Sequence, residues 1–585
     1  MRNGDAMRMP RPTRLAWTLI LLAGALFAQQ QPALRPASPP SAAPQEEAKG
    51  QITGSVVSAK TGEILKGVAV TLRGMRPRGQ GQGPPLTRDV MVGMDGRFVF
   101  SDLPAADYDV TVNKAGYGGQ LFSSRPLARI RLGHDESRHD VVIRLQPAAV
   151  VTGRVIDAYG EPLPEAQVYA LIRRAMPGRE SHWMTAQRAQ TNDLGEYRLH
   201  SLQGGKYVLA AQAPRATNPR GVGFAEFAPG FYPGAPSLDQ ATPLKLASGA
   251  EMNGVDFRLD LSPETTVRGI VLDSSTGEPC DDCNLRIGSE NVMGFDDFGT
   301  RPTKDGIFVI HGLRAGAHSI IVHASGGGQP RFFVEQVQVP QFGDVEVKLL
   351  VGGSQTVSGE FILEDPPEQQ QPPAAQGPQP GAQVQNATPG QQRPFMFALE
   401  SLGSFPFPGG RGNVPPQGGA FELTDVPAGD YKIRLYGPAG YLRSVTLDGR
   451  EIGGPRITVP RDGPLFGLKL HIAFDGATIS GVVKPASGEE TEGLRGEQVA
   501  TAVPDPGSNP YANRAVARVE LDGAFTLRGV VPGSYTLFVL PGLTIDVEDP
   551  DVRRALKPYG KQITVTRNEQ VRVELTATPD SVELW

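Results

Sequence analysis

The sequence predicts an all-β protein made of five tandem Greek-key β-sandwich domains. Three observations predict this class: a composition rich in turn-forming residues, a strand-like motif that opens each repeat, and a second motif that closes it. Since the chain has 585 residues, several times the length of a typical domain, more than one hydrophobic core is expected.

The composition favours short strands over long helices. There are 71 Gly and 53 Pro, with 7% aromatic and 39% hydrophobic residues, which is too many turn formers for long helices but enough apolar material for strands. The net charge is -5, and no basic block follows the first residues. We therefore expect no nucleic-acid partner.

The N-terminus has the pattern of an export signal. Several arginines precede an apolar run from Leu15 to Phe27 that is too short to favour a permanent span. We expect a signal peptide at residues 1–28, cleaved after Ala25 or Ala28, and a flexible Pro/Ala/Gln-rich spacer at 29–50. No cysteine follows closely, which argues against a lipid anchor, and no later run reaches 18 apolar residues. The mature chain is thus expected without a membrane span, in the periplasm or outside the cell.

Two motifs recur along the chain, which marks it as a repeat protein. The opening motif has Gly third: ITGSVV from Ile52, VTGRVI from Val151, VRGIVL from Val267, VSGEFI from Val357 and ISGVVK from Ile479. The closing motif begins DGRFVF at Asp95, LGEYRL at Leu194, DGIFVI at Asp305, GGAFEL at Gly418 and DGAFTL at Asp522. Their pairing predicts domains at 51–147, 148–262, 263–352, 353–474 and 475–585, with a disordered insert at 366–394 in the fourth.

The closing motif has a physical interpretation. Asp-Gly is favoured in two-residue hairpin turns, and the strand after it alternates, so that Phe98, Phe100 and Leu103 should face inward and Val99 outward. A Pro/Gly corner and an aromatic residue follow, a spacing typical of the tyrosine corner, in which a buried phenol bonds upstream backbone. That place is held by Tyr108, Tyr207, His318, Tyr431 and Tyr535. The third corner, with His, and the first, where Ala106 replaces Gly, are expected to be the least regular.

The paired motifs resemble the carboxypeptidase regulatory-like domain family. The resemblance extends over nearly the whole expected mature chain, and it implies that each domain is a seven-stranded, prealbumin-like (transthyretin-like) sandwich related to carbohydrate-binding-like folds. Similar domains occur as non-catalytic appendages of zinc carboxypeptidases, as extensions of outer-membrane transporters, and as tandem arrays in exported bacterial proteins. It implies the fold more strongly than the function.

Catalytic motifs are missing from the sequence. None of the 8 His has Glu three residues later, and neither HExxH nor GxSxG occurs. We therefore predict no enzyme activity, no catalytic residue, no metal site and no cofactor. His134, His139, His311 and His323, together with the corner histidine, are interpreted as structural or exposed side chains rather than metal ligands.

Cys280 and Cys283, as CDDC, are the only cysteines. In an exported chain a local disulfide is expected, although a redox pair or half of a metal site is the alternative.

Carbohydrate binding would need exposed aromatic platforms. The candidates are Trp183 in a loop of the second domain, and Phe231 with Tyr232 in its GFYPGAP segment. The alternative for this segment is an aromatic ring packed over a Pro-Gly turn.

The functional hypothesis is an exported, non-catalytic binding or scaffold protein whose sandwiches act as spacers and present loops to an envelope protein or polysaccharide. The alternatives are a carbohydrate-binding array and an accessory subunit of an exported hydrolase or outer-membrane transporter.

Overall fold

The structure is a computed structural model that describes residues 50–585 with gaps. Outside the described residues lie 1–49 and, further on, 76–85, 119–125, 175–180, 215, 218–222, 225–226, 262–264, 275, 281, 290–291, 294–297, 312, 314, 325–330, 341–342, 352–354, 366–394, 403–407, 438–439, 461–462, 487–497, 543–544, 580–581, 583 and 585. The expected signal peptide, nearly all of the spacer and the insert at 366–394 fall among these, so they stay predictions.

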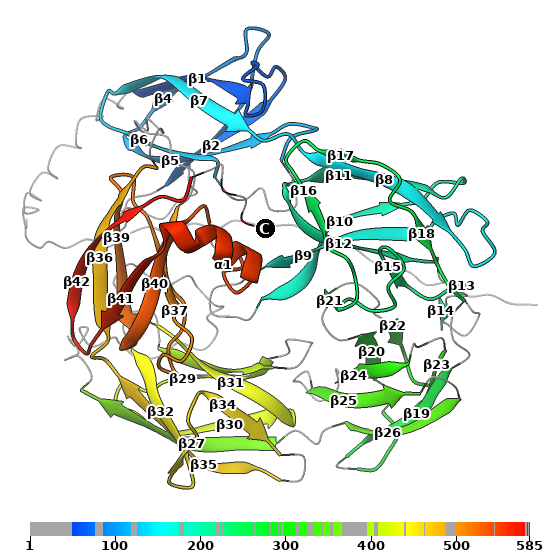
Figure 1. Ribbon diagram of the computed structural model, residues 1–585. Coiled ribbons are helices and arrows are strands. Elements are labelled where there is room, and N and C mark those ends of the chain that lie inside the picture. Colours follow the sequence, from blue (N-terminus) through cyan, green and yellow to red (C-terminus); the bar gives the residue numbers. More distant parts are fainter. Residues whose placement is uncertain are drawn as a thin grey trace, which may run out of the picture. The chain divides into compact units, whose positions relative to one another are not determined.

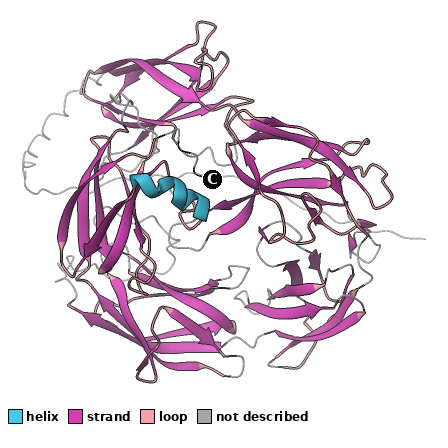
Figure 2. Ribbon diagram, in the orientation of Figure 1, coloured by secondary structure: helices cyan, strands magenta, loops and turns pink. Residues whose placement is uncertain are grey.

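The described residues form almost only β-strands (Figure 2). One short helix, α1 (Pro550–Leu556), precedes the 3-10 turn η2 (Lys557–Tyr559) in the last repeat. The strands lie in separate small sheets (Figure 1), and the larger sheets come in pairs around buried apolar clusters. The predicted class, all-β with tandem sandwiches, is confirmed.

The first repeat shows the basic arrangement. Its opening strand β1 (Gly50–Ser58) is the middle strand of a three-stranded sheet, between antiparallel β4 (Arg97–Leu103) and parallel β7 (Ser137–Leu145). The second sheet has the order β3-β2-β5-β6, with strands β2 (Ala69–Met75), β3 (Thr87–Met91), β5 (Ala106–Asn113) and β6 (Ala128–Leu132).

The third and fifth repeats share this topology. In the third, β19 lies between β23 and β26, opposite the sheet β22-β20-β24-β25; in the fifth, β36 lies between β39 and β42, opposite β38-β37-β40-β41. Their bounds are β19 (Thr266–Asp273), β20 (Cys283–Ser289), β22 (Phe298–Thr300), β23 (Ile307–His311), β24 (Gly316–Ala324), β25 (Arg331–Val339), β26 (Asp344–Val351), β36 (Ala477–Lys484), β37 (Val499–Pro504), β38 (Ala515–Arg518), β39 (Ala524–Val530), β40 (Gly533–Leu540), β41 (Lys561–Val565) and β42 (Gln570–Thr576).

The second and fourth repeats carry more strands than the seven that were predicted. In the second, β8 pairs with β11, β17 and β18, and the larger sheet has the order β15-β12-β9-β10 with β16 beside β12. Its edge strand β10 also pairs in parallel with the short strand β21 (Val292–Met293) of the third repeat. In the fourth, the sheets are β30-β27-β35-β32-β33 and β29-β28-β31-β34. The bounds of the strands in these two repeats are β8 (Ala149–Ile156), β9 (Gln167–Arg174), β10 (His182–Gln190), β11 (Glu196–Leu202), β12 (Gly205–Gln212), β13 (Ala216–Thr217), β14 (Gly223–Phe224), β15 (Gly230–Phe231), β16 (Leu244–Leu246), β17 (Glu251–Met252), β18 (Phe257–Arg258), β27 (Gln355–Glu364), β28 (Met396–Ser401), β29 (Pro408–Asn413), β30 (Gly419–Val426), β31 (Gly429–Tyr436), β32 (Tyr441–Leu447), β33 (Arg450–Glu451), β34 (Arg456–Val459) and β35 (Leu465–Ala473).

The glycine of each opening motif lies where two backbones approach closely. A Cβ atom added to Gly54 or Gly269 would lie 2.1 or 2.0 Å from the carbonyl oxygen of Val141 or Val347 in the parallel partner strand. The same contact would be 1.9 Å at Gly359 and Gly481, and at Gly153 the added Cβ would lie 1.9 Å from the carbonyl oxygen of Val255, between β17 and β18. This close approach explains why the third position of the motif is Gly.

The turn of the closing motif differs from the predicted two-residue hairpin. Gly96 has φ +74°, whereas Asp95 is not among the residues with positive φ. The Gly96 N–H donates to the Gly93 carbonyl oxygen at 3.0 Å, and the flanking strands β3 and β4 belong to different sheets. Residues 93–96 therefore form a four-residue turn in which only the fourth residue, Gly96, has positive φ.

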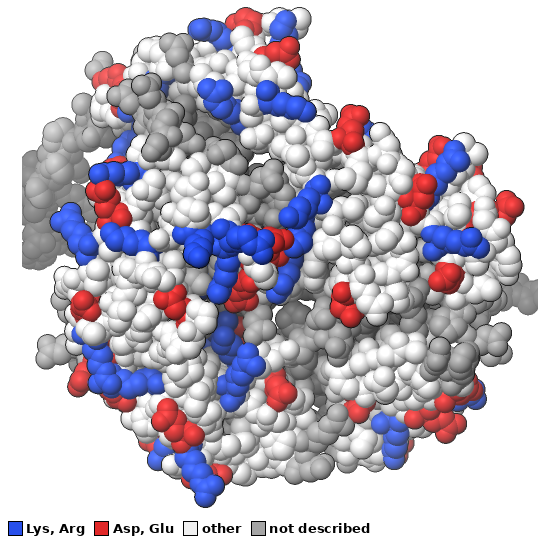
Figure 3. Space-filling model, viewed as in Figure 1, with Lys and Arg blue, Asp and Glu red and all other residues white. Residues whose placement is uncertain are grey.

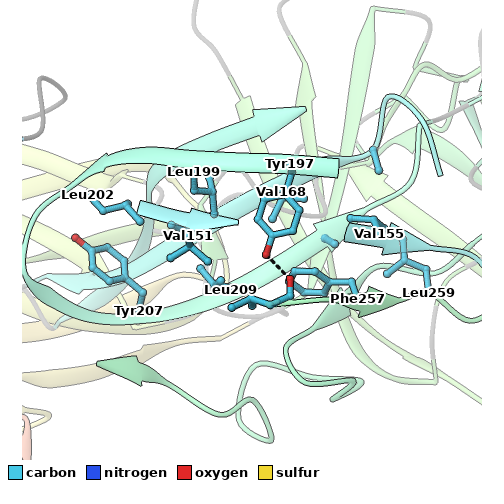
Figure 4. Packing of buried hydrophobic residues seen from close by; sticks show 14 of the residues in the cluster. Val151, Val155, Val168, Tyr197, Leu199, Leu202, Tyr207, Leu209, Phe257 and Leu259 are labelled. Carbon is cyan, nitrogen blue, oxygen red and sulfur yellow. Dashed lines mark hydrogen bonds between the residues drawn. The ribbon is translucent and has the colours of Figure 1, made fainter. Parts of the chain in front are cut away.

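The predicted alternation of the closing strand is confirmed. Phe98, Phe100 and Leu103 are buried, and Val99 is 47% exposed. Phe100 and Leu103 face the same side although they are three residues apart. The extra residue is accommodated at Asp102, which has φ +54°, next to a register shift between β1 and β4. In the second repeat Tyr197 takes the place of the first Phe, and its hydroxyl donates to the Val255 carbonyl oxygen at 2.6 Å within the core (Figure 4).

Candidate functional site

The corner residues make the same contact in four repeats. The hydroxyl of each tyrosine donates to the backbone carbonyl oxygen four residues earlier: Tyr108 to Pro104 at 2.6 Å, Tyr207 to Gln203 at 2.9 Å, Tyr431 to Pro427 at 2.6 Å and Tyr535 to Val531 at 2.7 Å. All four side chains are buried. The corner with Ala106 has as short a hydrogen bond as the fourth, although Ala106 is not among the residues with positive φ, as Gly429 and Gly533 of the fourth and fifth corners are.

Burial changes the acidity of these phenols. It raises the pKa of Tyr108 to about 12, although the nearby Arg88 lowers it somewhat. Burial also raises the pKa of Tyr207, Tyr431 and Tyr535. The hydroxyls are therefore neutral donors at physiological pH, which suits a structural role rather than proton transfer.

His318 occupies the corresponding place in the third repeat. It lies on β24, paired with Val337 of β25, and its ring is buried. The carbonyl group that would match the tyrosine acceptors belongs to residue 314, which lies outside the described residues. A buried imidazole thus fills the position that a phenol fills elsewhere.

The two cysteines are bonded to each other. Cys280 and Cys283 form a disulfide, and both lie buried in the apolar cluster of the third repeat with Val271 and Leu285. Within the described residues, Cys280, Asp282 and Cys283 are the one set of three His, Cys, Asp or Glu side chains whose ligand atoms all lie within 4.8 Å of one another. Since both sulfur atoms are engaged in the disulfide, the pair acts as a covalent link at the start of β20.

The candidate histidines lie apart from one another and have different local partners. His134 contacts Asp135 at 3.2 Å, whereas His139 and His311 each contact a neighbouring threonine, Thr53 and Thr266, at 3.3 Å. His323 lies on β24, on a sheet face different from that of His318 because the two are five residues apart. Among the described histidines, none belongs to a group that could share a metal ion.

Phe231, one of the three candidate aromatic residues, is buried. Phe231 is 5% exposed and lies in an apolar cluster with Tyr169, Leu171, Val208 and Ala210, on the outer face of the sheet that contains β9 and β12. A ring buried to this degree offers no face to a sugar, which favours the alternative of a packed aromatic ring for Phe231 over the stacking candidate.

The other two aromatic candidates are half-buried. Trp183 of β10 packs against the cluster around Phe231, and Tyr232 packs edge-on to Phe257 with ring centroids 6.0 Å apart. The three rings therefore lie in two different clusters, and they do not form one flat surface.

Charge on the visible surface is mixed. Lysine and arginine side chains lie among aspartate and glutamate side chains on the face drawn in Figure 3. Ion pairs among the described residues include Arg131 with Asp107 at 2.8 Å and Arg154 with Glu196 at 2.7 Å. No described helix is long and apolar enough to span a membrane.

Paired sheets around buried cores, repeated along the chain with the same glycine and corner contacts, define a tandem β-sandwich protein. Residues 51–136 and 150–222 match the model of the carboxypeptidase regulatory-like domain family. These two segments are carboxypeptidase regulatory-like domains, as their motifs predicted.

Comparisons with whole proteins gave distant similarities. The search of curated proteins found no match. Among solved structures, the chain is similar to the Bacillus anthracis TIE protein, at 12% identity over 72% of this chain and 73% of that chain, with a TM-score of 0.15. A streptococcal ancillary pilin matches at 12% identity over 52% and 99% with a TM-score of 0.17. The minor pilin GBS52 of Streptococcus agalactiae matches at 14% identity over 37% and 97% with a TM-score of 0.21.

Proposed function

We propose that this chain is an exported, non-catalytic binding or scaffold protein of the cell envelope. The match of two segments to the carboxypeptidase regulatory-like family supports it, because such domains serve as modules beside other activities. The repeats act as stable spacers, and their loops contact the partner, an envelope protein or polysaccharide.

The observation that carries this proposal is the exposure of apolar side chains on corresponding loops. In the first repeat, Met94 of the turn before β4 is 81% exposed, and Ile64 lies beside that turn, since a Cβ on Gly96 would overlap its side chain. In the second repeat, Tyr159 is 71% exposed, and Leu194 of the equivalent turn is also exposed. Contiguous exposed apolar groups mark interaction sites, and the recurrence of such exposed side chains on corresponding loops of two domains is what we take as the sign of a shared contact surface.

Site-specific photo-crosslinking in cells that produce the protein tests the proposal. A photoreactive amino acid in place of Met94 or Tyr159 is expected to form adducts with an envelope component. Matched positions on an exposed sheet face, Val99 and Val142, provide the control. Equal labelling from all four positions, or none from the loops, would contradict the presentation of loops.

Cell fractionation tests export. The protein is expected outside the cytoplasm and should begin at Leu26 or Gln29 by N-terminal sequencing. An intact Met1 in the cytosol would overturn this part of the proposal. Binding of the purified chain to a glycan array then separates a polysaccharide partner from a protein partner.

A further inference from the structure

The connection between the fourth and fifth repeats is short and tightly held. Strand β35 ends at Ala473 and β36 begins at Ala477, so three residues join the two sandwiches. The central one, Asp475, accepts a hydrogen bond from the Tyr441 hydroxyl at 2.8 Å and an ion-paired one from Arg443, both on β32 of the fourth repeat.

The fifth repeat holds the same connector residue from the other side. The backbone N–H of Asn568 donates to the Asp475 carbonyl oxygen at 2.6 Å, and the Arg567 guanidinium lies 3.9 Å from its carboxylate. Hydrogen bonds from Tyr441 and Arg443 keep the pKa of Asp475 below its usual value in spite of its burial, which acts in the opposite direction. The connector is therefore bonded to both sandwiches.

A loop of the fifth repeat also supplies a core residue to the fourth. Tyr511 is 4% exposed and lies within the apolar cluster of the fourth repeat, which includes Val445 and Leu468. Its hydroxyl accepts a hydrogen bond from the Val445 backbone N–H at 3.0 Å. That N–H on β32 thus finds its partner in the next repeat, as buried backbone groups require.

The loop that carries Tyr511 is fixed to its own repeat. Asn509 donates through its amide to the Pro532 carbonyl oxygen at 3.1 Å and accepts from the Tyr511 N–H at 2.9 Å. A smaller apolar cluster of Tyr441, Ala473 and Val531 lies next to it, and Val531 is also the acceptor of the fifth corner.

A polar contact completes the interface. The Arg434 guanidinium donates to the Asn513 side-chain oxygen at 2.9 Å while pairing with Glu400 of its own repeat at 3.1 Å. Arg434 is buried, so this hydrogen bond is shielded from solvent.

We infer that the fourth and fifth repeats form one rigid, cooperative body, in which Tyr511 serves as a core residue of the fourth sandwich. The part of the fourth sandwich around Val445 is therefore an interaction surface, and it binds the loop of residues 505–513 from the fifth repeat.

Hydrogen exchange of the full-length chain tests this inference. In Tyr511→Ala, amides of Tyr441–Leu447 are expected to exchange at least tenfold faster than in the wild type, because the N–H of Val445 loses its partner and the cluster opens. Tyr511→Phe keeps the ring and removes only the hydroxyl, so that the Val445 amide alone should exchange about threefold to tenfold faster. The control is Tyr159→Ala, which removes an exposed loop tyrosine of the second repeat and should leave these amides unchanged.

The two Tyr511 variants also separate folding from the interface. If the alanine variant does not fold, the phenylalanine variant still reports on the Val445 amide. Exchange of Tyr441–Leu447 that equals the wild type in both variants would overturn the inference, since Tyr511 would then not lie against β32. Faster exchange confined to the loop itself would overturn it as well.

Discussion

Replacing Gly269 by Ala tests the closest backbone approach in the third repeat. The added Cβ would lie 2.0 Å from the Val347 carbonyl oxygen and 2.8 Å from the Phe308 ring. An ordinary carbon–oxygen contact is about 3.3 Å or more, so strand β26 must move by more than about 1 Å. Such a shift lengthens the neighbouring ladder hydrogen bonds beyond useful range.

The expected loss follows from these bonds. Two weakened hydrogen bonds at about 1 kcal/mol each, with a buried backbone group left unpaired, give roughly 3 kcal/mol. At 1.4 kcal/mol per tenfold, amides of β19 and β26 should exchange about 100-fold faster in the full chain, measured by mass spectrometry.

Gly299→Ala in the same repeat is the matched control. No atom lies within 4 Å of the added Cβ, and Gly299 is not among the glycines with positive φ. This variant should be neutral or stabilised by up to about 1 kcal/mol. If both variants exchange alike, the close approach of β19 and β26 is not what selects glycine.

Four further predictions concern the stability of the corner, the ionisation of its tyrosine, the cysteines and the domain boundaries. Tyr431→Phe should lose about 0.5–1.5 kcal/mol of stability in chemical denaturation, and Tyr431→Ala about 3–5 kcal/mol; unchanged midpoints would show that the ring is exposed. Because burial raises the pKa of Tyr108 to about 12 in the folded state, its stabilising contribution is complete below about pH 10 and is lost as pH rises toward 12. Tyrosinate absorbance should show this group ionising after the exposed tyrosines, and simultaneous ionisation would contradict its burial. Thiol titration of the native chain should find Cys280 and Cys283 unreactive, whereas two reactive thiols would favour a redox or metal role. Limited proteolysis should cut first within 29–50 and 366–394, and early cuts inside the closing motifs would refute the predicted boundaries.

Patterns that are local and repeated could be predicted from the sequence. The alternation around Phe98 and the position of Tyr108 both follow from side-chain spacing within one strand and its corner. The turn at Gly96 was assigned the wrong geometry, because a dipeptide does not reveal that the strands on its two sides belong to different sheets.

Contacts specific to one repeat could not be predicted. Phe231 lies in a segment that covers the outer face of a sheet, and nothing in its neighbours distinguishes that packing from an exposed platform. Tyr511 is buried by the preceding repeat, a contact that no period in the sequence encodes. Tyr197 was detectable in principle, since a Tyr replacing Phe in a core position needs a hydrogen-bond partner.

The parallel pairing of the first and last strands has a mechanical consequence. In the first repeat β1 and β7 run side by side in the same direction, as do β19 with β26 and β36 with β42. The chain therefore enters such a repeat at one end of this strand pair and leaves at the other. Tension along the chain pulls the two strands past each other and loads all of their hydrogen bonds together, whereas an antiparallel terminal pair would open one bond at a time.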